Sequence, residues 1–132
     1  MNIVNRDLYS SALTHLGADA DANEYNDYQE RSPYIIANFC SAHKALDSKI
    51  RKAEGLEAAS SFSPVYLFLE SNFPLCEKLA SPAVFYLAAM LVIDDDPELS
   101  DKLYERYCDL ITEATMSLSY QSGKIENKYF AT

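Results

Sequence analysis

The side chains best suited to hold a metal are His43 and the cysteines Cys40, Cys76 and Cys108. Cys40 and His43 lie three residues apart, a step that zinc ligands use. No second closely spaced pair of ligands follows, and free cysteine is among the most buried residue types. The sequence therefore favours core packing for Cys40 and His43, and it predicts no metal and no other cofactor.

Acid–base or nucleophilic chemistry needs a positioned base, and the only histidines are His15 and His43. Glu105 and Asp109 share a helical spacing, but no pocket-forming pattern accompanies them, so a solvated face is the simpler interpretation. The run Asp94–Asp96 lacks the spacing of a calcium loop. It precedes a helix instead, where the backbone dipole favours carboxylates. We expect no enzyme.

The totals indicate one helical domain over residues 1–132, since 132 residues suffice for a single core and only three are glycine. The formal net charge of −9 disfavours specific binding to nucleic acid and to anionic membranes. The odd number of cysteines and the lack of an apolar leader suggest a reduced, intracellular protein. The apolar run 83–93 is too short to cross a bilayer, which takes about 20 residues.

Apolar residues at helical spacing predict four helices, at roughly 6–16, 33–53, 75–93 and 97–121. We expect Asn5 to cap the first helix and Ser32 to cap the second, with Pro33 at its first position. Gly17, Gly55 and Gly123 should end the first, second and fourth helices. The last two helices should form an antiparallel hairpin through the acidic turn.

Residues 65–69 are all apolar or aromatic, which predicts a short buried strand or an extended arm between the second and third helices. The expected fold is mostly α, a small four-helix bundle with that arm. Residues 123–132 form a C-terminal tail that carries Ile125, Tyr129 and Phe130. A chain end this apolar is expected to dock on a partner.

Two further features point to protein partners. Acidic residues line one face of the fourth helix, whereas the second helix ends in a basic cluster. Ordinary surface charge explains both, but complementary contact between copies arranged head to tail would explain them too and can close a ring. The acidic face consists of Asp101, Glu105, Asp109 and Glu113.

Three tyrosines, Tyr25, Tyr28 and Tyr34, cluster where the second helix begins. Tyrosine is enriched in interfaces because it combines a large area with a polar tip. Core filling is the alternative. With the tail residues, these tyrosines are the candidate interface.

Four segments follow one another in a suggestive order: LYSSALTHLG, EYNDYQERSPYIIANFC, FSPVYLFLESNFPL and FYLAAMLVIDDDPELSDKLYERYCDLI. In this order the chain, from about residue 6 to residue 128, resembles the head–tail connector (adaptor) proteins of tailed double-stranded DNA phages and prophages. In that family, similar helices end in a hairpin of the same type as the last of these segments.

The resemblance implies a structural, non-enzymatic protein of the virion neck, assembled in the host bacterial cytoplasm. Its copies would form a ring below the portal protein, contact other neck and tail proteins, and extend the channel. Genomic DNA would pass without specific binding, repelled by the acidic face. Other neck or tail-completion proteins, a DNA-packaging accessory and a non-viral helical interaction module are alternatives.

Overall fold

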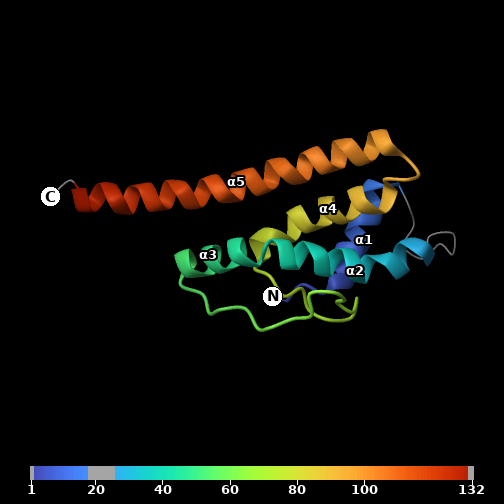
Figure 1. Ribbon diagram of the computed structural model, residues 1–132, viewed down its shortest axis with the longest axis horizontal. Coiled ribbons are helices and arrows are strands. Elements are labelled where there is room, and N and C mark those ends of the chain that lie inside the picture. The colour runs from blue at the N-terminus through green and yellow to red at the C-terminus, as the bar shows by residue number, and fades with distance from the viewer. Residues whose placement is uncertain (1, 18–25, 131–132) are drawn as a thin grey trace.

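A computed structural model describes residues 2–17 and 26–130, with the side chains of residues 119–130 left outside the description. The predicted mostly α fold is confirmed, but the described residues form five α-helices rather than four (Figure 1). They are α1 (Asn5–His15), α2 (Asn26–Ala42), α3 (Lys44–Glu54), α4 (Ala80–Val92) and α5 (Pro97–Phe130). A 3₁₀ turn, η2 (Glu77–Leu79), leads into α4.

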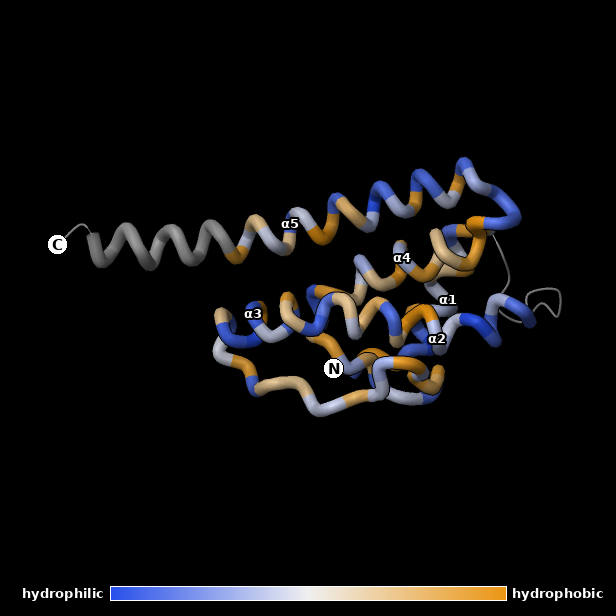
Figure 2. The backbone as a smooth tube through the Cα atoms, in the orientation of Figure 1, coloured by the Kyte–Doolittle hydropathy of each residue, from blue (hydrophilic) through white to orange (hydrophobic). Residues whose placement is uncertain are grey.

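The apolar helix α4 lies at the centre, with α1, α2 and α5 packed around it. Leu87, Ala88 and Leu91 of α4 are almost completely buried. Figure 2 shows the contrast with the first part of α5, up to residue 118, which is hydrophilic on one side and hydrophobic on the other. None of the helices in the described residues is both long and apolar enough to span a membrane.

The predicted hairpin of α4 and α5 is confirmed, and side chains of the turn and of the first turn of α5 fix it. Asp96 Oδ1 accepts a hydrogen bond from the backbone N–H of Leu99 at 3.1 Å, so Asp96 caps α5 as expected. The buried Ser100 hydroxyl donates to the carbonyl of Ala89 at 2.8 Å. This bond joins α5 directly to the backbone of α4.

The expected start of the second helix at Pro33 was wrong, because α2 begins at Asn26 and holds Pro33 in its interior. A proline there removes one helical hydrogen bond. Ser32 does not cap the helix; its hydroxyl donates to the carbonyl of Tyr28, four residues earlier, at 2.7 Å. The carbonyl of Pro33 accepts a bond from Leu67 N–H at 3.1 Å, which ties this turn of α2 to the following loop.

The single helix expected over 33–53 is two helices, separated at His43. The backbone of His43 leaves the helical region, and its Nε2 lies 2.7 Å from the Tyr107 hydroxyl of α5. A tertiary contact therefore coincides with the break. Gly55 ends α3 in the left-handed conformation with φ of 71°, as predicted.

The segment between α3 and α4 contains no strand, so of the two forms predicted for 65–69 the strand is absent and the extended arm is not confirmed. The described part of the chain has only an isolated bridge between Val4 and Asn72. Leu67 and Leu69 are buried, but neighbouring side chains alternate outward. The described residues form no strand that would offer a sheet edge to pair with. It is an irregular loop.

This loop also caps α1, which corrects the role expected of Asn5. The backbone N–H groups of Asn5 and Arg6 donate to the carbonyls of Ser71 and Leu69 at 2.9 and 2.8 Å. The Asn5 side chain is buried inside α1 and donates to the Phe68 carbonyl at 3.0 Å. Carbonyl groups of the loop thus accept hydrogen bonds from the first backbone N–H groups of α1, in place of a capping side chain.

The other end of the loop is held by Asp47, a buried carboxylate of α3. Its oxygens accept from the backbone N–H of Cys76 at 2.6 Å and from Arg51 Nε at 2.9 Å. Arg51 in turn donates to the carbonyls of Glu57 and Pro74. One ion pair therefore fastens both ends of the segment 57–76.

The fourth expected helix is longer than predicted, because α5 runs through Gly123 to Phe130. The expected end at Gly123 and the separate tail from residue 123 are corrected accordingly. Glycine costs about 1 kcal/mol inside a helix, yet it stops one only where a left-handed residue is needed. At 34 residues α5 is about 50 Å long, and Figure 1 shows it continuing past α3.

Candidate interaction surfaces

The acidic face of α5 is open to solvent over four turns. Asp101, Glu105, Asp109 and Glu113 are all exposed. The opposite, apolar face packs on the body of the subunit; its residues Leu99, Leu103, Tyr107, Leu110, Ile111, Ala114 and Leu118 are buried or half-buried. The predicted separation of the two faces is confirmed.

A basic face lies on α3, where Lys44, Lys49 and Lys52 are exposed. Residues of α3, including Ile50, and apolar residues of α5, including Leu118, line a common crevice. The acidic residues of α5 therefore lie on the side of that helix that faces away from α3. One subunit presents opposite charges on two separate surfaces.

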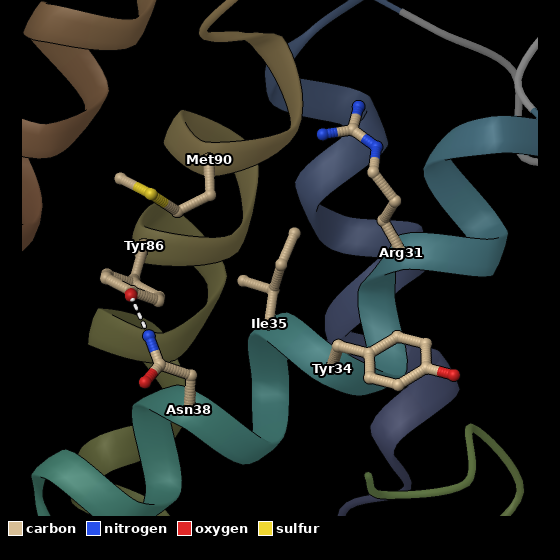
Figure 3. Close-up of a pocket in the computed structure, with 6 residues that line it drawn as sticks. All are labelled: Arg31, Tyr34, Ile35, Asn38, Tyr86 and Met90. Carbon is tan, nitrogen blue, oxygen red and sulfur yellow. Dashed lines mark hydrogen bonds between the residues drawn. The ribbon is translucent and has the colours of Figure 1, made fainter. Parts of the chain in front are cut away.

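A groove between α2 and α4 has a volume of about 490 Å³ (Figure 3). Six side chains line it: Arg31, Tyr34, Ile35 and Asn38 from α2, and Tyr86 and Met90 from α4. Asn38 Nδ2 donates to the Tyr86 hydroxyl at 2.6 Å, which joins the two walls. We call this hollow the α2–α4 groove.

Helix packing explains why the groove exists. Helices α2 and α5 both flank α4, and the end of α2 reaches α5 through the contact between His43 and Tyr107. Farther along, Tyr86 and Met90 of α4 remain half-buried, and Ile93, the residue directly after the helix, is exposed. Residues spaced by four and three share one helix face, so one face of the most apolar helix is only partly covered.

Aromatic side chains extend this surface beyond the groove. The Tyr34 ring, 55% exposed, meets the Tyr66 ring edge-on at 4.9 Å between centroids. Tyr66 in turn meets Phe68, 63% exposed, at 5.0 Å. Exposed apolar patches of this kind commonly mark protein-binding surfaces.

One end of the α2–α4 groove is acidic. Arg31 Nη2 donates to the carbonyl of Leu91 at 2.9 Å, and Nε pairs with Asp27 at 3.1 Å. The exposed turn Asp94–Asp96 begins just after Leu91, so it lies at the same end as Arg31. Four carboxylates thus accompany one guanidinium at this end.

The reactive groups of the sequence lie mostly in the interior. Cys40 is buried as predicted, and burial raises the pKa of its thiol to about 12. Burial likewise raises the pKa of Cys76 to about 11. Cys108 is exposed, because it lies beside the solvent face of α5. The described residues contain no group of three or more possible metal ligands.

His43 is half-buried, and desolvation lowers the pKa of its imidazole. Its hydrogen-bond partner is a phenol, and burial raises the pKa of that Tyr107 hydroxyl to about 12. A catalytic cysteine needs a lowered pKa. Cys40 is shifted in the opposite direction, so the arrangement fits packing.

The predicted interface residues lie in different places. Tyr34 is exposed at the groove, but Tyr28 is 8% exposed and its hydroxyl donates to Asp95, so Tyr28 offers little surface to a partner. Tyr25 and the side chains of Ile125, Tyr129 and Phe130 lie outside the described residues.

Sequence reasoning missed Ile35, Tyr86 and Met90 as surface residues. The only polar side-chain group in the run 83–93 is the Tyr86 hydroxyl, and it was the signal that one face of α4 reaches solvent. A search of family models, curated proteins and solved structures finds no match to this chain.

Proposed function

We propose that this chain is a structural subunit of the phage neck, a head–tail connector that forms a ring below the portal. In this proposal it assembles in the host bacterial cytoplasm, contacts the portal and other neck proteins, and catalyses no reaction. The outer face of α5 lines the channel through which genomic DNA passes.

The observation that carries the proposal is the acidic face of α5. Four carboxylates recur every fourth residue and all are exposed. Phosphate groups are repelled by such a wall, because affinity for DNA comes largely from lysine and arginine that release counterions. A channel that DNA must traverse without sticking needs this property.

The test is to reverse charge on that face with the double variant Glu105→Lys/Asp109→Lys. We expect rings on isolated portal complexes to form as with the wild type, seen by electron microscopy. These rings should bind double-stranded DNA in a salt-dependent manner, whereas wild-type rings should not. The matched control, Glu57→Lys/Glu77→Lys, reverses two exposed acids outside the face.

Loss of the ring in the double variant alone would instead assign the acidic face to contact between copies, opposite the basic face of α3. Failure of the wild-type chain to bind portal complexes would reject the connector. The exposed aromatic groove would then favour the second candidate, a helical protein-interaction module outside the virion.

A further inference from the structure

The α2–α4 groove is an incomplete helix-packing site. Helix α4 packs against α1, α2 and α5, while its residues Tyr86 and Met90 are only half-buried where they line the groove. Amphipathic helices bind in such hollows by placing apolar residues in the groove. The groove therefore has the shape and chemistry to receive one more helix.

We propose that the α2–α4 groove binds the C-terminal end of α5 from a second copy of the chain. This inference rests on the proposed function, since it names the contact through which copies assemble. Neighbouring copies would join head to tail, the arrangement that closes into a ring when the rotation is suitable.

Length is the first argument for this occupant. The described contacts of α5 with its own subunit extend to Leu118, beside Ile50 and Glu54 of α3. The helix itself continues to Phe130, which adds 12 residues, or about 18 Å. Figure 1 shows this part of the helix extending past α3.

The sequence of the last turns is the second argument. Residues 125–130 contain Ile125, Tyr129 and Phe130 within a helical span of about 8 Å. The α2 wall of the groove, from Arg31 to Asn38, spans about 10 Å. The apolar part of the helix end therefore matches the groove in length.

Charge is the third argument. Residues 119–132 carry two lysines, Lys124 and Lys128, and one glutamate, Glu126, although the whole chain has a net charge of −9. The acidic end of the groove, with Asp27 and the turn Asp94–Asp96, complements that positive segment. Because the chain is strongly acidic overall, a net positive segment is a favourable one to place against another copy.

The experiment uses the full chain and a fluorescent synthetic peptide of residues 119–132. Fluorescence anisotropy measures peptide binding, and sedimentation equilibrium measures self-association of the chain without peptide. A scrambled peptide and a Lys124→Glu/Lys128→Glu peptide serve as controls, and both should bind at least about tenfold more weakly, about 1.4 kcal/mol.

Met90→Glu and Met116→Glu form a matched pair, because Met90 lines the groove and Met116 is 65% exposed elsewhere on α5. Met90→Glu should weaken peptide binding and self-association by tenfold or more, whereas Met116→Glu should change neither by more than about threefold. Tyr34→Ala, at an exposed groove position, should act like Met90→Glu. It keeps the test valid if Met90→Glu fails to fold.

Equal binding by wild type, Met90→Glu and Tyr34→Ala would overturn the groove assignment, while portal binding by the same proteins would still support a connector. Groove-dependent peptide binding without portal binding would support the groove and reject the connector. If the groove variants lose portal binding but still bind the peptide, another protein occupies the groove and the inference is wrong.

Discussion

One side of α4 is fully buried, whereas another lies partly open between α2 and α5. Leu87, Ala88 and Leu91 have almost no exposed surface, but Met90, adjacent in sequence, lines the groove. Both sides are comparably apolar in sequence. The difference therefore comes from how the neighbouring helices are arranged, and the open side is where a partner can add burial without disturbing the fold.

The largest expected effect separates these two sides directly. Leu91→Ala should lower the free energy of unfolding by about 3–4 kcal/mol, because it leaves a cavity in a closed core. Met90→Ala should cost about 1 kcal/mol or less, since its site already borders solvent. Urea unfolding measures both, and equal losses would show that the groove side is as tightly packed as the core.

Two ion pairs with the same spacing give the next largest effect. Asp47 and Arg51 form a buried pair, whereas Asp27 and Arg31 form an exposed one with 74% of the Asp27 side chain accessible. Asp47→Ala should lower the free energy of unfolding by about 2–3 kcal/mol, because the Cys76 N–H and the Arg51 guanidinium lose their carboxylate acceptor. Asp27→Ala should cost under about 0.5 kcal/mol.

Thermal and urea unfolding of both variants measures this contrast. Asp47→Asn should lose less than Asp47→Ala, because an amide oxygen still accepts the bond from Cys76. If Asp47→Ala unfolds at the same urea concentration as the wild type, the loop 57–76 does not depend on this contact.

Thiol reactivity compares buried with exposed positions of the molecule. Cys108 is exposed, while Cys40 and Cys76 are buried with raised pKa values. The thiolate is the reactive form. A colorimetric thiol reagent should therefore modify one of the three cysteines rapidly, and the other two only as fast as the protein unfolds. Loss of the rapid phase in Cys108→Ser is the control; its persistence would contradict the assignment.

The sequence predicted those parts of the fold that depend on local pattern. Apolar spacing located most of the helical residues, and Gly17 and Gly55 do adopt positive φ at helix ends. The prediction that Gly123 ends the last helix was wrong, because nothing in the local sequence distinguishes a glycine inside a helix from one at its end. The prediction that the second helix begins at Pro33 was wrong, because α2 accepts a proline in its interior. The sequence did not reveal the contact between that turn and the loop.

The groove and the break at His43 depend on tertiary contacts. The partner of His43 is Tyr107, 64 residues later in the chain. The partial exposure of Tyr86 and Met90 on α4 depends on how α2 and α5 are arranged around that helix, and the spacing of apolar residues does not predict this arrangement. The acidic face of α5, by contrast, follows from spacing alone and was predicted correctly as exposed.

The smallest expected effect is a pH dependence at the point where α2 and α5 meet. Burial lowers the pKa of His43 in the folded chain, whereas in the unfolded chain it should be about 6.5. The unfolded state therefore binds the proton more readily. The stability contributed by neutral His43 is complete above about pH 6.5 and is lost as the pH falls below that value.

The hydrogen bond supplies the structural reason. The Tyr107 hydroxyl is protonated throughout this pH range, and it donates to Nε2 when neutral His43 carries its proton on Nδ1. Protonation of the imidazole removes this acceptor. Between about pH 7.5 and pH 5.5, the wild type should lose more stability in urea than His43→Gln, which cannot titrate. If His43→Gln shows the wild-type slope as well, the junction of α2 and α5 does not sense pH, and aromatic packing among Phe39, Tyr86 and Tyr107 holds it without a contribution from titration of His43.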